Sequence, residues 1–433
     1  MSLPYWVGID LGSTTTKAVL LDGDGRVIGR GITNSRSNYD VACQVALAEG
    51  LADARLARLA RELGEPEGEE EHSERMQRIS LALRHRQFLD NLEALHEVLL
   101  RLCAEKGLDD GWRDAVGGIL AAMERESAAL FVPGAERKSD FFRDLAGSMY
   151  MRLAEATAEE RGLPYEQVLG LYDKGILEVE NRTPSDETFR RNLVRAAETG
   201  GFDAEMSDAA RRAAGLELVQ AGSVGTGYGR ARLPFPRKQI RSEILCHGLG
   251  AHAMFPGTRT VLDIGGQDTK AIQVDGAGIV TSFQMNDRCA AGCGRYLGYI
   301  ADEMNLGLHE LGPLASKSRK CVKINSTCTV FAGAELRERL SLGERREDIL
   351  AGLHRAIILR AMSLLARSGG IEEEFTFTGG VARNPAAVEA LQKLVAENYG
   401  DRTLNISPSS IYTGALGAAL FALRDKDAVV EAA

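Results

Sequence analysis

Two polar turns far apart in the chain repeat one pattern, and this repeat constrains the fold more than any other feature. In each, an apolar strand ends in an aspartate, small or polar residues follow, and a lysine closes the turn: GIDLGSTTTK at Gly8–Lys17 and LDIGGQDTK at Leu262–Lys270. A second strand and an Asp-Gly dipeptide follow both patterns, and such a dipeptide favours a hairpin turn. The sequence therefore predicts an internal repeat of two similar halves that contain β-sheet.

The residue types in these turns suit phosphate and magnesium. Glycine and hydroxyl residues let backbone N–H groups crowd around phosphate oxygens. A carboxylate binds Mg²⁺, usually through water, and a lysine offers a positive point charge. Either turn alone is more often only a turn, and no P-loop motif occurs in the sequence.

A third element, FTFTGGVARN at residues 375–384, places two glycines between a strand and a helix that starts after Asn384-Pro385. In this order, the three elements resemble the phosphate-1, phosphate-2 and adenosine motifs of the actin, Hsp70 and sugar-kinase superfamily. The resemblance implies an α/β fold with two ribonuclease-H-like domains and ATP in the cleft between them. It assigns Asp10 and Asp263 to Mg²⁺ or water, with Gln267 and Asp268 helping to position the attacking water. Expected nucleotide contacts are Gly12, Ser13, Thr14, Thr15, Lys17, Gly265, Gly266, Lys270, Gly379, Gly380 and Asn384.

The residues between the two repeats have a different character. From about 41 to 215, strand signals disappear and Ala, Leu, Glu and Arg dominate, with apolar residues at helical spacing. We expect a helical insertion over 41–215, a first ATPase domain formed by 1–40 and 216–255, and a second over 256–433. The insertion is predicted to provide a docking surface for partner subunits.

Composition excludes several classes of function. The net charge of −9 and pI near 5.5 do not favour binding of nucleic acid or an anionic membrane. The first residues, MSLPYWVGID, lack the pattern of a secretory signal, and no run of about 18 uncharged apolar residues occurs. We therefore expect a cytoplasmic protein whose seven cysteines are thiols or ligands rather than disulfides.

Four of these cysteines fall between 289 and 328, and three interpretations compete. They could be buried small hydrophobes. They could bind zinc, although the spacings of Cys289, Cys293, Cys321 and Cys328 fit common zinc frameworks poorly. They could also provide two ligands to an iron–sulfur cluster, because Cys289 and Cys328 each precede a predicted helix whose N-terminus stabilises thiolates. A cluster with four thiolates would then need a second chain.

The motifs NDRCAAGCGRYL and STCTVF, together with the nucleotide motifs, closely resemble the ATPase family of benzoyl-coenzyme A reductase subunits and 2-hydroxyacyl-coenzyme A dehydratase activators. The resemblance covers about residues 1–40 and 216–425. It implies that Cys289 and Cys328 bind one [4Fe-4S] cluster shared with a partner chain, and that the chain uses ATP and Mg²⁺. Cys293 falls where the family varies, so we expect it only near the cluster.

The large insertion departs from the short, homodimeric dehydratase activators. It suggests the larger ATPase subunit of ATP-dependent benzoyl-coenzyme A reductase, which couples ATP hydrolysis to low-potential electron transfer for dearomatisation of benzoyl-coenzyme A. The implied partners are a shorter homologous ATPase subunit, two substrate-reducing subunits and ferredoxin as electron donor. The alternatives are an activator of a 2-hydroxyacyl-coenzyme A dehydratase, a cluster-free small-molecule kinase and an actin-like polymer.

Glu243 and His247 lie four residues apart, on one face of a helix predicted over Arg237–Ala253. Packing or solvent contact is the expected role for both side chains.

Overall fold

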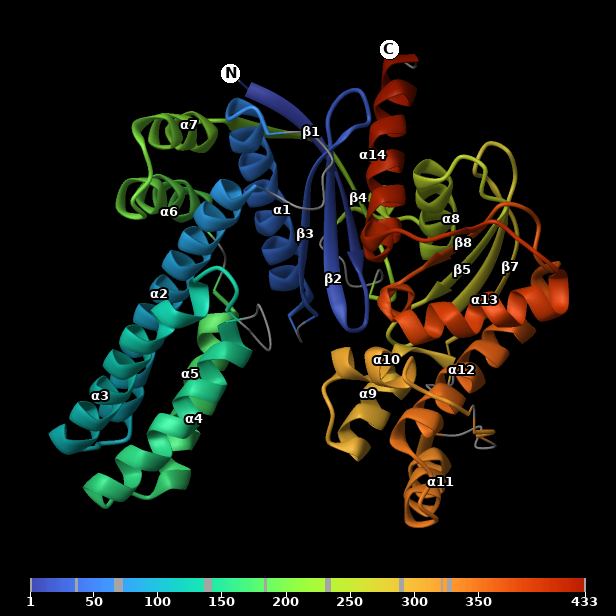
Figure 1. Ribbon diagram of the computed structural model, residues 1–433. Coiled ribbons are helices and arrows are strands. Elements are labelled where there is room, and N and C mark those ends of the chain that lie inside the picture. Colours follow the sequence, from blue (N-terminus) through green and yellow to red (C-terminus); the bar gives the residue numbers. More distant parts are fainter. Residues whose placement is uncertain are drawn as a thin grey trace. The chain divides into compact units, whose positions relative to one another are not determined.

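The computed structural model describes residues 2–35, 38–65, 73–135, 142–182, 185–229, 235–287, 292–320, 322–324 and 329–431. The chain divides into two compact units (Figure 1). One contains residues 1–3 and 51–218 and consists mainly of helices, and the other contains residues 4–50 and 219–433 and holds most of the strands.

The strands are β1 (Ser2–Leu11), β2 (Thr15–Leu21), β3 (Val27–Asn34), β4 (Glu217–Thr226), β5 (Thr260–Ile264), β6 (Thr269–Val274), β7 (Val280–Asn286), β8 (Phe375–Thr378) and β9 (Leu404–Asn405). The α-helices are α1 (Tyr39–Glu62), α2 (Glu74–Glu105), α3 (Asp110–Ser127), α4 (Phe142–Arg161), α5 (Tyr165–Glu180), α6 (Asp186–Thr199), α7 (Ala204–Ala214), α8 (Glu243–Met254), α9 (Gly294–Met304), α10 (Leu308–Ala315), α11 (Thr329–Ser341), α12 (Arg346–Ser368), α13 (Pro385–Tyr399) and α14 (Thr413–Glu431).

The strands form two sheets that begin with the same antiparallel meander. Their strand orders are β3-β2-β1-β4 and β7-β6-β5-β8-β9. In the first sheet Asp10 pairs with Lys17, and in the second Asp263 pairs with Lys270 at the same register. Strand β8 then adds to β5 in parallel. This arrangement confirms the predicted pair of ribonuclease-H-like sheets.

Helix α12 forms the centre of the larger core of the second unit. Its apolar residues pack with those of α9, α10, α13 and strands β5 and β8. It is also the one helix in the described parts of the chain that is long and apolar enough to cross a membrane. Because most of its apolar stretch is buried inside the protein, its apolarity is explained by core packing.

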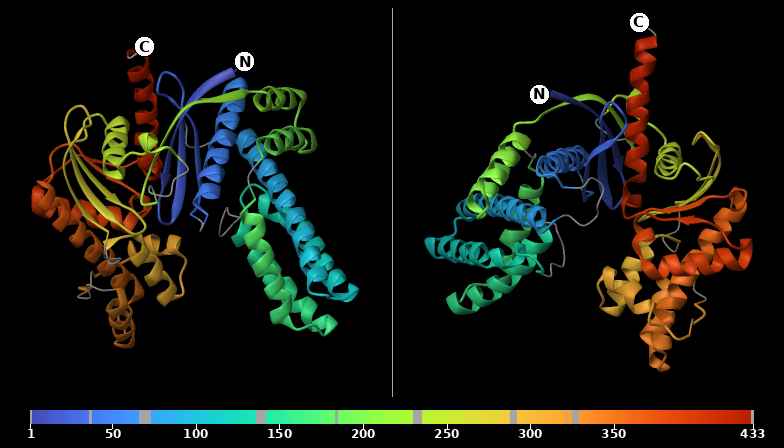
Figure 2. Two further views of the ribbon diagram at one scale, coloured as in Figure 1. Left: turned by 180° about the vertical axis from the view of Figure 1, so that it is seen from behind. Right: turned by 45° about the horizontal axis from the view of Figure 1, so that its top comes forward.

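Helix α14 packs on the first sheet and α8 on the second, and the two helices lie against each other (Figure 2). A Cβ atom added to Gly417 would lie 1.8 Å from the carbonyl oxygen of Cys246, and one added to Gly250 would lie 2.0 Å from that of Thr413. Ala418 and Ala422 of α14 pack on Trp6 of β1. Helix α14 thus packs against the first sheet although it falls within 256–433, the segment predicted as the second domain. Small residues in α8 and α14 permit the close approach of the two helices.

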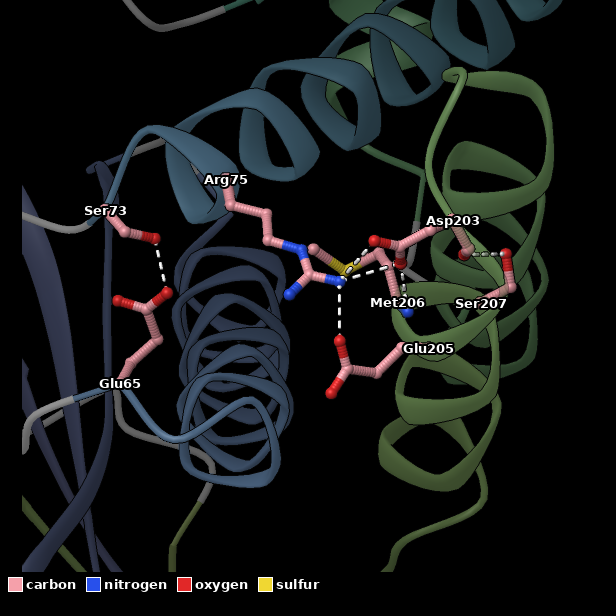
Figure 3. Close-up of polar contacts among 7 residues, drawn as sticks. All are labelled: Glu65, Ser73, Arg75, Asp203, Glu205, Met206 and Ser207. Atoms are coloured by element: carbon pink, nitrogen blue, oxygen red, sulfur yellow. Dashed lines mark hydrogen bonds and ion pairs between the residues drawn. The ribbon is translucent and has the colours of Figure 1, made fainter.

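The helical unit has two apolar cores joined by the long helix α2. The C-terminal part of α2 packs with α3, α4 and α5, and its N-terminal part packs with α1, α6 and α7. At the N-terminal end, Arg75 bonds Asp203 at 2.7 Å and Glu205 at 3.0 Å, while Asp203 caps α7 by accepting from Met206 N–H (Figure 3). These ion pairs are solvent-exposed, so their contribution to stability is small and burial in the two cores dominates.

Candidate functional site

Two buried carboxylates lie at equivalent strand ends. Asp10 ends the apolar run of β1 and Asp263 that of β5, and their side chains are 5% and 2% exposed. Because β8 runs parallel to β5 with Thr378 opposite Asp263, the Thr378 hydroxyl donates to Asp263 Oδ1 at 2.8 Å. Carboxylates this deeply buried need compensating partners.

Lys270 provides one of these partners. Its buried ammonium lies 2.8 Å from Asp268 Oδ2, 3.3 Å from Asp263 Oδ2 and 3.8 Å from Glu243 Oε1. Burial alone would lower the pKa of Lys270, but the surrounding carboxylates outweigh it and raise that pKa. Burial would likewise raise the pKa of Asp263, yet the charges of His247 and Lys270 lower it well below its usual range. Lys270 therefore balances the acidic groups, and its contact with phosphate stays a prediction.

His247 and Glu243 come from α8 and complete the cluster. His247 Nδ1 lies 3.3 Å from Asp263 Oδ1, and Glu243 is 5% exposed. Burial raises the pKa of Glu243, partly offset by Lys270. For His247, burial lowers the pKa but Asp263 outweighs it, so the net shift is upward. The sequence had suggested packing or solvent contact for both residues, whereas they face the carboxylates.

Glycines let several loops approach the two carboxylates. Gly227 (φ +103°) follows β4, and an added Cβ there would lie 2.6 Å from Asp10 Oδ1. Gly379 (φ +86°) follows β8, and its added Cβ would lie 3.0 Å from Asp263 Oδ1. An added Cβ on Gly266 would lie 2.2 Å from Thr14 Oγ1, so the two predicted phosphate turns meet at this point. Side-chain-free backbone around paired carboxylates suits a phosphate and its Mg²⁺.

The first turn is held by Ser35, the residue directly after β3. Ser35 donates its hydroxyl to Gly12 O at 2.6 Å, and its backbone N–H donates to Thr14 O at 2.8 Å. Lys17 Nζ lies 3.3 Å from the Cβ that Gly12 would carry, so this ammonium stays beside the turn. Thr14 is exposed and Ser13 half-buried, while Gln267 and Gly265 are half-buried in the second turn and Thr15 is half-buried at the start of β2. The structure thus brings the predicted residues of both turns together.

Asn384, which was predicted to contact the nucleotide, also stabilises the local structure. Its Oδ1 caps α13 by accepting from Ala386 and Ala387 N–H at 3.0 and 3.2 Å. Its Nδ2 lies 3.0 Å from Nε2 of the buried His354, whose Nδ1 lies 2.7 Å from Leu350 O. Burial lowers the pKa of His354, so the neutral ring donates from Nδ1 and accepts at Nε2. Gly380, just before this cap, is exposed.

Replacing Asn384 by alanine is expected to lower the free energy of unfolding of the second unit by about 1 to 2 kcal/mol. The change removes a helix cap and leaves the buried His354 acceptor without its donor. Urea unfolding followed by tryptophan fluorescence would measure it. Asn398→Ala, near the end of the same helix, is the matched control, and equal stability of the two variants would contradict the assignment.

The two predicted cluster ligands, Cys289 and Cys328, lie outside the described residues. Among the residues that are described, no group of three or more His, Cys, Asp or Glu side chains is arranged to bind a metal ion. Helix α9 starts at Gly294, so the buried Cys293 occupies its N-cap position. Helix α11 starts at Thr329, directly after Cys328. The two helices pack together, with Gly333 facing Tyr299 and Arg337 paired with Glu303.

Comparison with known proteins identifies two kinds of relative. Over 202 residues (47% of this chain and 75% of the relative), the chain is 44% identical to the (R)-2-hydroxyglutaryl-CoA dehydratase activating ATPase of Acidaminococcus fermentans. It is 29% identical over 237 residues (55% of this chain and 82% of the relative) to one of the subunits of the benzoyl-CoA reductase of Thauera aromatica. The comparisons therefore favour the dehydratase-activator alternative over the benzoyl-CoA reductase role expected from the insertion.

The fold comparison is consistent with the two sheets. The crystal structure of component A of the (R)-2-hydroxyglutaryl-CoA dehydratase of Acidaminococcus fermentans matches with a TM-score of 0.53 and 24% identity, covering 98% of this chain and 99% of that one. The actin/Hsp70-like fold predicted from the three motifs is thereby confirmed. The BadF/BadG/BcrA/BcrD ATPase family matches residues 7–422, and the chain belongs to this family.

Proposed function

We propose that this chain is the ATP-hydrolysing activator of a 2-hydroxyacyl-coenzyme A dehydratase or a close relative of such an enzyme. Hydrolysis would drive low-potential electrons into the partner. The identity to a dehydratase activating ATPase, higher than that to a benzoyl-CoA reductase component, supports this choice of partner.

One observation carries the proposal: the second phosphate turn is bonded to the helix that follows the first cysteine motif. Gly294 and Arg295, the first residues of α9, donate their N–H groups to Gly265 O and Gly266 O, both at 2.8 Å. The Thr269 hydroxyl also donates to Gly292 O, at 2.5 Å. A change in the turn on nucleotide hydrolysis would therefore be transmitted directly to the N-terminus of α9.

The residues of the turns fit a nucleotide with Mg²⁺. Asp10 and Asp263 would hold the hydrated ion or the attacking water, with Gln267 and Asp268 beside them. Backbone N–H groups of Gly12–Thr15 and of Gly265 and Gly266 would contact phosphate. Gly380 is exposed with nothing within 4 Å of an added Cβ and would leave space for the adenosine, while Gly379 lets the β8 turn approach Asp263.

For the electron carrier, Cys289 and Cys328 would each provide a thiolate, and a partner chain would provide the other two. When bound, a [4Fe-4S] cluster supplies one-electron transfer at low potential. Packing between α9 and α11 supports this assignment, because the two helices that follow the cysteines are neighbours. We also propose that the protein is cytoplasmic and receives electrons from ferredoxin.

Anaerobic purification tests the proposal. We expect Mg²⁺-dependent ATP hydrolysis and about four iron atoms per pair of chains. Cys289→Ala and Cys328→Ala should lose the iron while keeping ADP binding, whereas Cys103→Ala, in the helical unit, should keep both. Iron-free protein with full ability to activate a 2-hydroxyacyl-coenzyme A dehydratase would contradict the electron-carrier role.

A role as the larger ATPase subunit of benzoyl-coenzyme A reductase is the second candidate. The helical unit over 51–218 favours it, because the sequence match to the dehydratase activating ATPase covers only 47% of this chain. Its partners would be a shorter homologous ATPase subunit and two substrate-reducing subunits. Stable co-purification with three different chains would favour this candidate, and a homodimer that activates a dehydratase would exclude it.

A further inference from the structure

We propose that His247 is a positioning residue that bridges Asp10 and Asp263, the two carboxylates that the proposed ATPase function places at the nucleotide. The inference rests on that function and adds a residue from α8 to it.

The two ring nitrogens of His247 define its position relative to the two carboxylates. Nδ1 lies 3.3 Å from Asp263 Oδ1. Nε2 and Asp10 Oδ2 lie 2.8 and 2.9 Å from one point, the Cβ that Gly414 would carry. The imidazole therefore lies close to both carboxylates, with Nδ1 nearest Asp263 and Nε2 in the region of Asp10, and these carboxylates come from different sheets.

A packing role does not explain this placement. His247 is buried, and within the described part of the chain its Nδ1 has no well-aligned hydrogen bond, so the 3.3 Å contact with Asp263 is an ion pair. A buried polar group without a well-aligned hydrogen bond costs stability, and the ion pair with Asp263 offsets part of that cost. Such groups are expected where a site is completed by its ligand.

The surrounding backbone fixes the imidazole in this position. Helix α8 is pressed against α14 at Gly250 and Gly417, where any side chain would clash with backbone of the other helix. Gly414 leaves open the space between Nε2 and the Asp10 carboxylate. His247 consequently sets the separation of the two carboxylates, and a shift of about 1 Å in such a group can cost roughly 100-fold in rate.

The test uses two substitutions that each keep one of the two contacts. An asparagine amide nitrogen can occupy the place of Nδ1, and a glutamine amide nitrogen that of Nε2. For both His247→Asn and His247→Gln, we expect kcat for ATP hydrolysis to fall about 10- to 100-fold, with KM for ATP within about three-fold of wild type. His252→Gln, on the same helix, is the matched control and should hydrolyse ATP at the wild-type rate.

Each outcome decides the matter. Wild-type kcat in either His247 variant would overturn the bridge, and so would parallel loss of nucleotide binding and thermal stability, which indicates a purely structural role. If both variants fail to fold, Gly414→Ala is used instead. This variant keeps the His247 and Asp10 side chains but adds a methyl group beside both of them, and an unchanged kcat for ATP hydrolysis would overturn the proposal. A wild-type protein without ATPase activity would instead overturn the proposed function itself.

Discussion

Asp263→Asn is expected to lower kcat for ATP hydrolysis by about 100-fold or more, the cost typical of losing one preorganised electrostatic group. Asparagine keeps the size of the side chain and the acceptor for the Thr378 hydroxyl, but removes the charge that Mg²⁺ or the attacking water would use. Nucleotide affinity should change less, because the glycine turns and Lys17 remain. Steady-state phosphate release and ADP titration would separate the two effects.

The fold should survive this change. Lys270 keeps Asp268 at 2.8 Å and Glu243 at 3.8 Å, so the ammonium is not left as an unpaired buried charge. We expect the free energy of unfolding to fall by about 2 kcal/mol at neutral pH. Because the folded protein lowers the pKa of Asp263, its ionisation stabilises the fold above the unfolded pKa of 3.8, and that contribution is lost as the pH falls below it. The stability difference between wild type and variant should therefore shrink in acid.

Asp275→Asn is the matched control for Asp263→Asn. Asp275 belongs to the same sheet but lies in the next turn, between β6 and β7, where its Oδ1 accepts from Ala277 and Ile279 N–H. An asparagine oxygen can accept the same bonds, so ATP hydrolysis should be unchanged. If the Asp263→Asn variant hydrolysed ATP at more than half the wild-type rate, the proposed catalytic role of Asp263 would be wrong.

The sequence predicted the strand ends well because their pattern is local. An apolar strand, an aspartate, small residues and a lysine define each hairpin within about ten residues, and the register Asp10↔Lys17 follows from the turn. The helix predicted to start after Asn384-Pro385 is α13, which begins at Pro385 and ends at Tyr399 because Asn384 is a cap and Gly400 stops it. Signals of this kind need no knowledge of distant residues.

The predicted start of α8 was wrong because a distant contact decides it. The sequence favoured a helix from Arg237, whereas α8 begins at Glu243. The preceding segment is bound to the end of β4 instead: Arg241 N–H donates to Gly225 O at 3.0 Å, and the Thr226 hydroxyl donates to Arg241 O at 3.0 Å. Tertiary pairing thus outweighs helix propensity there.

The role of α8 in the site could not be predicted for a similar reason. The spacing of Glu243 and His247 is the same on a solvated helix face as on a buried one. Only the crossing of α8 with α14, far away in sequence, shows that this face points at Asp263. The sole local hint is the set of small residues Gly248, Gly250 and Ala251, which indicates close packing but not its partner.

The crossing of α8 and α14 leads to the second prediction of large effect. Gly417→Ala is expected to lower the free energy of unfolding of the second unit by about 3 kcal/mol. The new methyl group would lie 1.8 Å from Cys246 O, which is backbone and cannot rotate away, so the two helices must separate. That movement would also loosen Ala418 and Ala422 from Trp6 and shift His247 from its carboxylates.

Trp6 makes this prediction measurable in the second unit alone. The chain has two tryptophans, and the other, Trp112, belongs to the helical unit. In a Trp112→Phe background, urea unfolding followed by fluorescence therefore reports the unit that contains the α8–α14 crossing. Gly298→Ala in α9 is the control, since nothing lies within 4 Å of its added Cβ and alanine should raise stability by about 0.5 to 1 kcal/mol. If the two glycine variants were equally stable, the helices would not cross as closely as the structure places them, and the arrangement that holds His247 between Asp10 and Asp263 would lose its support.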